Sequence, residues 1–102
     1  MKLNKLLLAD TLLADRTRLV IITLIAASEE EISFMTLLTS LEMTKGNLAS
    51  HLRKLEDENY IEVRKEFVGR KPLTTYSITN IGKKAVKDYL DELDMFISKV
   101  KI

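Results

Sequence analysis

The sequence predicts a mainly helical chain with one small antiparallel β-hairpin, an α+β fold class. Along most of the 102 residues, apolar positions recur at spacings of three and four, the pattern of helices with one buried face. Between residues 61 and 79 the pattern changes to alternation on either side of a break that contains glycine and proline, which is typical of a hairpin. Helical spacing then returns from residue 80 onward.

The first 43 residues are expected to form two helical regions separated by a short strand. Leucine, isoleucine and valine recur at helical spacing from Asn4 to about Ala27, and a break or kink is expected near Asp10–Asp15. An acidic turn at residues 29–31 is followed by Ile32–Phe34, which we expect to form a short strand that pairs with the later hairpin. Ser33 is a suitable N-cap for a helix over about residues 34–41, because its hydroxyl can accept a bond from a free amide.

A third helix, expected to start after a turn at residues 42–44, combines a leucine face with a polar outer face. Leu48, Leu52 and Leu55 share one side at spacings of four and three. The opposite side and its flank carry Gly46, Asn47, Ser50, His51, Arg53 and Lys54. The first three turns contain no acidic residue, and acids begin only at residues 56–58. A helix that merely covers a core would tolerate acids across that face.

The ends of this helix are marked by residues with suitable backbone preferences. Thr44 can act as the N-cap. Gly46 lies in the first turn, where its helix penalty is small and its missing side chain permits a phosphate to approach closely. Asn59 is expected to end the helix, because asparagine tolerates the left-handed conformation.

A basic hairpin is expected directly after this helix. Residues 61–67 alternate between apolar and charged side chains, and residues 73–79 form a β-branched and aromatic return strand. The tip is expected at Gly69–Pro72, where Arg70 and Lys71 would attract an anion. Taken alone, the polar helix face could be a solvated surface and His51 an ordinary histidine. Together, helix and hairpin predict a winged helix-turn-helix with extra N- and C-terminal helices, a layout used on duplex DNA.

The last helix, expected over about residues 80–101, carries an apolar seam of its own. The seam repeats at spacings of four, three, four and three, which are the a and d positions of a heptad: Val86, Leu90, Leu93, Ile97 and Val100. We expect residues 80–102 to form a dimerisation helix that packs, with Leu6 and Leu7 of the N-terminal helix, against a second copy. The alternative is that this helix folds back onto its own domain.

Two segments make the chain resemble a known family. They are GNL-x-SHL-x-KLE at residues 46–56 and VGR-x-P-x-TTY at residues 68–76. With Arg18 in the first long helix and Gly82 near the start of the last, they are similar to winged-helix transcriptional regulators of the MarR and ArsR groups, in a compact form of about a hundred residues. Two departures are Asn59, where such proteins usually have glycine, and Ala49, where a small hydroxyl residue is common.

Composition excludes several other classes of protein. A length of 102 residues suits a single domain over residues 1–102. No cysteine and one histidine exclude disulfides, a zinc finger and a thiol nucleophile, so we expect no metal or cofactor. No acid/base motif is recognisable, and an enzyme is not expected. Charged residues interrupt the early leucines and no apolar membrane span is visible, so a cytoplasmic protein without membrane contact is expected.

Net charge is distributed unevenly along the chain. The first 43 residues hold four Lys/Arg and six Asp/Glu, whereas residues 44–71 hold seven Lys/Arg and five Asp/Glu. Positive charge therefore coincides with the helix and hairpin that are expected to meet DNA.

The leading hypothesis is a homodimeric regulator of transcription that reads an inverted repeat in double-stranded DNA. The residues expected to contact bases or phosphates are Lys45, Gly46, Asn47, Ser50, His51, Arg53, Lys54, Arg70 and Lys71. The alternative is a winged-helix module that assembles a larger protein complex, but the outer face of the helix at 44–59 lacks the apolar or aromatic anchors of such a module.

An unknown small-molecule effector is left open by the sequence. An apolar ligand between the N- and C-terminal helices would be lined by Met35, Tyr89, Met95 and Phe96. The alternative is that these four residues belong to the ordinary core.

Overall fold

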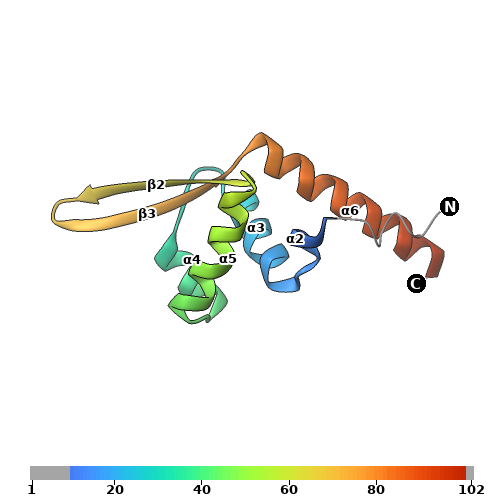
Figure 1. The fold of residues 1–102 in the computed structure, drawn as a ribbon, viewed down its shortest axis with the longest axis horizontal. Helices are drawn as coiled ribbons and strands as arrows, with labels where there is room; N and C mark the ends of the chain where they lie inside the picture. Colours follow the sequence, from blue (N-terminus) through green and yellow to red (C-terminus); the bar gives the residue numbers. More distant parts are fainter. Residues whose placement is uncertain (1–9, 101–102) are drawn as a thin grey trace.

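The computed structural model describes residues 10–100, which form five helices and a three-stranded antiparallel sheet (Figure 1). The predicted mainly helical fold with a small antiparallel hairpin is confirmed. In chain order the elements are α2 (Thr11–Ala14), α3 (Arg16–Ala27), β1 (Ile32–Ser33), α4 (Phe34–Leu41), α5 (Lys45–Asp57), β2 (Ile61–Val68), β3 (Lys71–Ile78) and α6 (Asn80–Val100). None of the helices in this part of the chain is long and apolar enough to cross a membrane.

Two aspartates produce the break that was expected in the N-terminal helical region. The Oδ1 atom of Asp10 accepts hydrogen bonds from the backbone amides of Leu12 (2.8 Å) and Leu13 (3.2 Å), which starts α2. Five residues after Asp10, Asp15 ends α2 in an extended conformation and caps α3 by accepting a hydrogen bond from the amide of Arg18 at 3.0 Å. That amide hydrogen bond is also the main cause of the lowered pKa of Asp15.

The sheet has the order β1-β3-β2, and its hairpin is tighter than the sequence indicated. Lys71 pairs with Val68 and Pro72 with Phe67, so both residues belong to β3 and not to the tip. Gly69, with φ of +66°, and Arg70 alone reverse the chain. Proline is tolerated in β3 because β1 pairs only with residues 75 and 76, which leaves an edge of β3 open near the tip.

Strand β1 is shorter than the expected segment. It contains Ile32 and Ser33 only, whereas Phe34 begins α4. The side chain of Ser33 accepts a hydrogen bond from the amide of Thr36 at 3.0 Å. The predicted N-cap is therefore confirmed, and it is this cap that turns the chain into the helix directly after Ser33.

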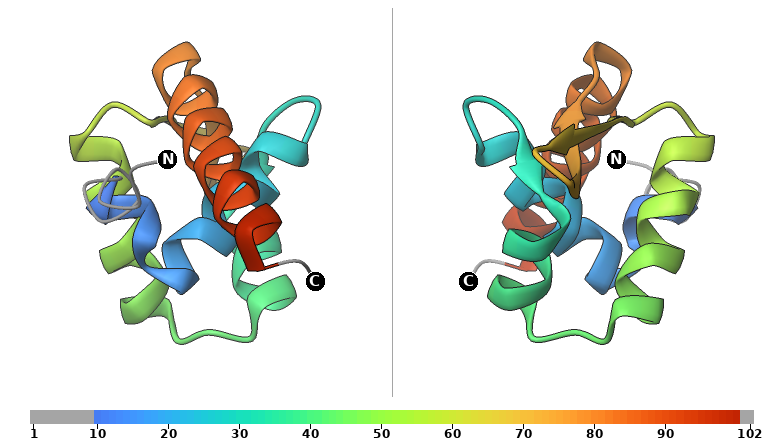
Figure 2. Two further views of the ribbon diagram at one scale, coloured as in Figure 1. Left: turned by 90° about the vertical axis from the view of Figure 1, so that its right-hand side faces the viewer. Right: turned by 90° about the vertical axis from the view of Figure 1, so that its left-hand side faces the viewer.

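The core surrounds α3 and receives buried side chains from all four other helices, β2 and β3, while the half-buried Ile32 of β1 packs against it. Its buried hydrophobic side chains are Leu13, Ile21, Ile22, Ile25, Leu37, Leu48, Leu52, Leu55, Ile61, Tyr76 and Val86. Viewed end-on, α4 and α5 lie on opposite sides of this core and are joined by the turn at residues 42–44 (Figure 2). The helix-turn-helix expected from the sequence is thus present.

The molecule is elongated because the β2–β3 hairpin and α6 project in opposite directions from this core (Figure 1). Its principal extents are 55 × 26 × 22 Å and its radius of gyration is 15.3 Å. A compact chain of 100 residues would have a radius of gyration of about 13 Å. Both projections therefore present surface that the rest of residues 10–100 does not cover.

The start of α6 is locked against the junction between α5 and β2. The Oγ1 atom of Thr79 accepts from the amide of Gly82 at 2.9 Å and donates to the carbonyl oxygen of Asn59 at 2.6 Å. The amide of Thr79 donates to the carbonyl oxygen of Tyr60 at 3.1 Å. Gly82 is buried here, and a Cβ atom at this position would overlap the carbonyl of Tyr60. The junction thus requires glycine for close approach rather than for backbone freedom.

We therefore expect Gly82→Ala to lower the free energy of unfolding by about 1–3 kcal/mol, because the backbone at Tyr60 must move to admit the methyl group. Urea unfolding at fixed protein concentration measures the effect. The matched control is Gly46→Ala, where a Cβ would meet nothing within 4 Å and stability should stay the same or rise slightly. Equal stability of the two variants would contradict the close packing at Gly82.

Candidate nucleic-acid interface

Three buried leucines position α5, and one residue at each end marks where the helix begins and ends, as the sequence predicted. Leu48 and Leu55 are fully buried and Leu52 is nearly so. The Oγ1 atom of Thr44 accepts a hydrogen bond from the amide of Asn47 at 3.2 Å, which confirms the N-cap. Asn59 has φ of +62°, so the chain leaves the helix through the left-handed conformation expected of this residue. The helix is therefore fixed in rotation, with one face inside the core.

The outer face of α5 is exposed and bears the polar residues selected from the sequence. Exposed side chains or backbone are found at Lys45, Gly46, Asn47, Ser50, Arg53 and Lys54. A shallow hollow of about 490 Å³ runs along this face and is lined by Gly46, Ala49, Ser50, Arg53, Lys54 and Asp57. Open space around Gly46 leaves the first turn of the helix accessible to a close backbone contact.

His51 differs from the other selected residues of α5 because it contacts another helix. It is half-buried, and its Nδ1 atom lies 3.3 Å from the Nη1 atom of Arg18. The Nε atom of Arg18 donates to the carbonyl oxygen of Leu12 at 2.8 Å, and Nη1 lies 3.8 Å from Asp15. Arg18 thereby joins α2, α3 and α5. The residues are 33 positions apart, so no local pattern could have revealed the contact between Arg18 and His51.

The hairpin exposes Arg70 at its turn and Lys71 at the first position of β3. Arg64 is held elsewhere, because its Nη2 atom lies 2.6 Å from Glu31 and 3.5 Å from Glu66. Lys65 is exposed on the opposite face of β2 and was not among the residues predicted to contact DNA.

The face of the hairpin that carries Lys65 is turned toward α5. A hollow of about 340 Å³ lies between them and is lined by Phe34, Ala49, Leu52, Arg53, Glu56, Val63, Lys65, Thr74 and Tyr76. The alternation of side chains along β2 could have indicated this orientation of Lys65, because residues 61, 63 and 65 point to the same face and Ile61 is buried and Val63 half-buried. Lys65 therefore lies on the face of β2 that packs against the core nearer the base of the strand, but at a position beyond the core. It is on the same side of the molecule as α5.

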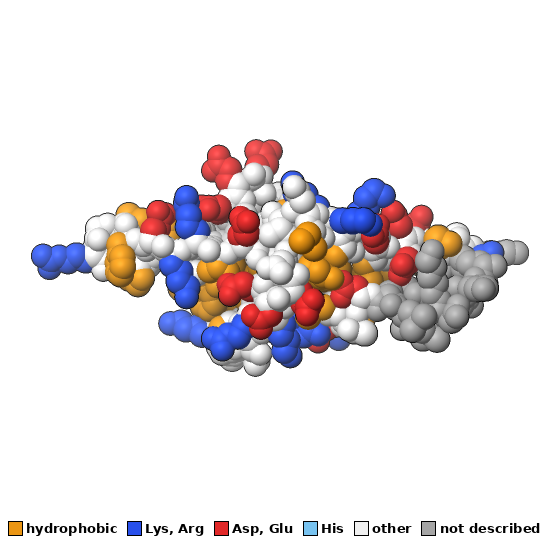
Figure 3. Space-filling model, turned by 45° about the horizontal axis from the view of Figure 1, so that its top comes forward, with side chains coloured by type: hydrophobic (Ala, Val, Ile, Leu, Met, Phe, Trp, Pro, Cys, Tyr) orange, Lys and Arg blue, Asp and Glu red, His pale blue; other side chains and the backbone are white. Residues whose placement is uncertain are grey.

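Positive charge gathers on the hairpin and on one edge of the molecule. Figure 3 shows Lys and Arg side chains at the hairpin end and along the lower edge. Within residues 10–100, six cations of α5 and of the hairpin form no ion pair: Lys45, Arg53, Lys54, Lys65, Arg70 and Lys71. In contrast, Lys84 and Lys87 of α6 each bind an aspartate one turn away. The unpaired group can bind an external polyanion without first breaking an internal pair.

The proposed dimer seam of α6 divides into a buried and an exposed part. Val86 is packed into the core of its own chain, and Leu93 is half-buried. Leu90, Ile97 and Val100 are each at least 45% exposed. Leu6 and Leu7 lie outside the described residues. The apolar stripe beyond Tyr89 therefore projects from the core, so the structure does not fold the end of this helix back into it.

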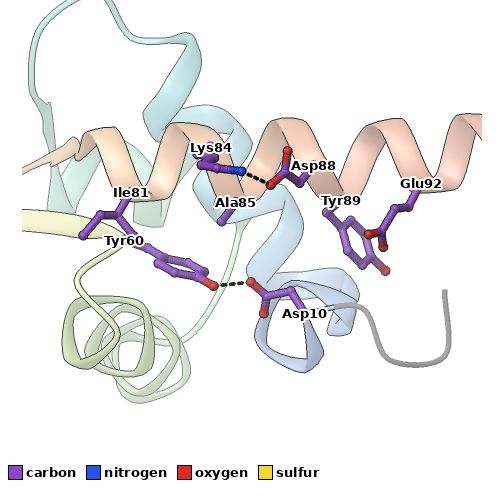
Figure 4. Close-up of a pocket in the computed structure, with 8 residues that line it drawn as sticks. All are labelled: Asp10, Tyr60, Ile81, Lys84, Ala85, Asp88, Tyr89 and Glu92. Atoms are coloured by element: carbon purple, nitrogen blue, oxygen red, sulfur yellow. Dashed lines mark hydrogen bonds and ion pairs between the residues drawn. The ribbon is translucent and has the colours of Figure 1, made fainter. Parts of the chain in front are cut away.

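Of the four residues considered for an effector site, three are exposed in the part of the chain that the structure describes. Met35 on α4 and Met95 on α6 are about half exposed, and Phe96 is exposed as well. Only Tyr89 lines the hollow of about 410 Å³ between α2, the α5–β2 junction and α6 (Figure 4). The other lining residues are Asp10, Tyr60, Ile81, Lys84, Ala85, Asp88 and Glu92.

The hydroxyl of Tyr60 closes one side of this hollow by donating a hydrogen bond to the carboxylate of Asp10 (Figure 4). Burial and this hydrogen bond raise the pKa of Tyr60 well above its ordinary value, so the phenol stays neutral. Within residues 10–100, no group of three or more His, Asp or Glu side chains is placed to hold a metal ion.

A helix pair with a short turn, followed by a projecting two-stranded wing, defines a winged helix-turn-helix protein. Residues 17–97 match the family described as winged helix DNA-binding domain, and the chain belongs to that family. An uncharacterized protein of Methanocaldococcus jannaschii, MJ0432, is 38% identical over 64 residues, which are 63% of this chain and 70% of that protein.

Solved structures share this fold. A transcriptional regulator homologue from Pyrococcus horikoshii has a TM-score of 0.88 and 26% identity, covering 100% of both chains. The crystal structure of MarR has a TM-score of 0.71 and 22% identity, covering 96% of this chain and 66% of that one. Bacillus subtilis PadR in complex with operator DNA has a TM-score of 0.64 and 21% identity, covering 74% of this chain and 47% of that one.

The predicted resemblance to MarR and ArsR regulators is confirmed, and PadR regulators share the fold as well. The family is described as a DNA-binding domain, and the family and fold match regulators of transcription, which are not enzymes.

Proposed function

We propose that this DNA-binding regulator acts in the cytoplasm as a homodimer on an inverted-repeat operator, as a single domain over residues 1–102. The observation that carries the proposal is the exposed outer face of α5, whose first three turns carry no acidic residue and which lies beside the unpaired Lys65 of the hairpin. The major groove admits an α-helix, and the wing would then reach the flanking backbone or minor groove. PadR, a neighbour with the same fold, has been solved with operator DNA.

In this proposal the residues of α5 divide between reading bases and holding phosphates. Asn47 is suited to adenine, since its amide can donate to N7 and accept from the N6 amino group. Arg53 and Lys54 would contact guanine or phosphate, with Ser50 and His51 beside them. Lys45 and the backbone at Gly46 lie at the start of the helix, where a phosphate is favoured by free amides.

The wing would hold the DNA next to this site. Arg70, at the turn, is the candidate for the minor groove, whose negative potential is greatest where A·T pairs narrow it. Lys71, one position further, would contact a phosphate. Neither side chain is engaged in an ion pair within the described part of the chain.

Homodimerisation is supported by the exposed stripe on α6. Leu90, Ile97 and Val100 repeat at heptad spacing on a helix that leaves the core, and such a stripe is buried when two helices pack together. A two-fold axis at residues 80–102 would present two copies of α5 to successive major-groove turns, about 34 Å apart.

No comparable feature of the described residues supports the second candidate function, a module that assembles a protein complex. The exposed outer face of α5 carries polar and charged side chains and Ala49, without aromatic or large apolar anchors. Genomic fragments selected by the purified protein would decide between the two. Enrichment of a common sequence with two-fold symmetry supports the regulator, and random recovery of fragments argues for the module.

Base reading and phosphate holding can be separated within α5. Asn47→Ala should weaken binding to the selected site by about 1–3 kcal/mol and leave binding to random DNA nearly unchanged. The control Lys45→Ala should weaken binding to both DNAs by similar factors, because a phosphate contact is independent of sequence. Fluorescence anisotropy at one salt concentration gives the affinities of the wild type and of both variants for the two DNAs. If Asn47→Ala weakens binding to both DNAs equally, Asn47 does not make a base-specific contact.

Measuring the oligomeric state tests whether the exposed apolar stripe of α6 forms a dimer interface. Replacing Leu93 and Ile97 together with glutamate should give monomers and weaken operator binding, because each half-site then loses the avidity of the pair. The matched control replaces Lys84 and Lys87, whose exposed ion pairs contribute little, with glutamine. Analytical ultracentrifugation measures the state. A monomeric wild-type protein at concentrations of tens of micromolar would contradict the proposed dimer.

A further inference from the structure

The two faces of the β2–β3 hairpin differ in chemistry. Successive strand residues point to opposite faces, and directly paired residues share a face. The inner face, which is turned toward α5, carries the pairs Val63–Tyr76, Lys65–Thr74 and Phe67–Pro72. The outer face carries Glu62–Ser77, Arg64–Thr75, Glu66–Leu73 and Val68–Lys71. Carboxylates are thus confined to the outer face.

Phe67 is the most exposed large hydrophobic side chain of the described residues, at 73%. Its cross-strand partner Pro72 is also exposed, so the two form one apolar patch near the tip. The patch lies roughly 13 Å along β2 beyond Val63, at 3.3 Å per residue, and the hairpin here projects past the core (Figure 1). The fold of the chain does not require an aromatic ring at this position, since the ring lies outside the core cluster.

The charges around this patch indicate what covers it. Lys65 precedes it on the same face, and Arg70 follows it at the turn. No carboxylate shares this face, whereas Glu62 and Glu66 occupy the other. An apolar patch between two unpaired cations fits a partner that is anionic at its edges and apolar between them. The deoxyribose rings that line the minor groove, flanked by phosphates, have this character.

We propose that Phe67 and Pro72 pack against the deoxyribose wall of the minor groove beside the major-groove segment that α5 occupies. This inference rests on the proposed function and adds a contact that is independent of charge. Lys65 binds the phosphate on one side, Arg70 enters the groove on the other, and the ring between them excludes water from the sugar edge. The contact strengthens binding to duplex DNA by burial of apolar surface, so its contribution does not depend on salt.

The neighbouring Val68 provides a matched control. It is 62% exposed at the same end of the hairpin but points to the opposite face. Phe67→Ser should weaken binding to the selected DNA on the order of tenfold, as expected when a ring face leaves an apolar contact. Val68→Ser should change the affinity by less than about twofold, which is close to the range of neutral surface substitutions.

Affinities measured across a series of salt concentrations identify the kind of contact. Phe67→Ser should lower the affinity by the same factor at every salt concentration. The slope of log affinity against log salt concentration should therefore equal that of the wild type, because no phosphate contact is lost. Arg70→Ala, in contrast, should reduce the magnitude of the slope by about one unit. Circular dichroism and sedimentation of both serine variants should match those of the wild type.

Two results would overturn the inference while leaving the proposed function in place. Equal affinities of Phe67→Ser and wild type would remove the ring from the DNA interface. Loss of the dimer in Phe67→Ser would assign the patch to a second copy of the chain. If the wild-type protein itself fails to enrich or bind any duplex DNA, the proposed function fails, and this inference fails with it.

Discussion

The packing of the α5 leucine face against α3 is the constraint on which the rest of the structure depends. Leu48, Leu52 and Leu55 face the buried isoleucines of α3, and replacing one such leucine with alanine typically costs about 2–5 kcal/mol. This packing fixes the rotation of α5 about its own axis. A fixed rotation leaves the polar residues on a single outward face and places the unpaired cations where an external anion can reach them. Arg18 reinforces the arrangement through its contact with His51.

The two projections depend on the end of the same helix. Asn59 and Tyr60 supply the carbonyl oxygens to which Thr79 binds, so the end of α5, the base of the hairpin and the start of α6 meet at one junction. This junction sets the direction of the hairpin relative to α5 and the direction of α6 relative to the core. Buried Gly82 permits the close approach. One small junction therefore links the proposed DNA-contacting face to the proposed dimer helix.

Local patterns in the sequence predicted most of the fold, but not the contacts between distant residues. The α5 helix was predicted closely because its cap, leucine spacing and left-handed end are all local signals. The hairpin tip was placed too widely, since Lys71 and Pro72 resemble turn residues and only strand pairing shows that they belong to β3. Heptad spacing on α6 could not tell that Val86 enters its own core whereas Ile97 is exposed. The position of Lys65 beside α5 likewise depends on how the hairpin is oriented.

Dimethyl sulfate footprinting of the wild-type protein on a selected genomic fragment tests the central claim most directly. The reagent methylates guanine N7 in the major groove and adenine N3 in the minor groove, so it distinguishes the two grooves. If two copies of α5 occupy the major groove and the wings lie beside them, guanines should be protected in two clusters about one helical turn apart, with protected adenines next to each cluster. Protection confined to adenines, or unchanged methylation at saturating protein, would contradict the assignment of α5 as the DNA-reading helix.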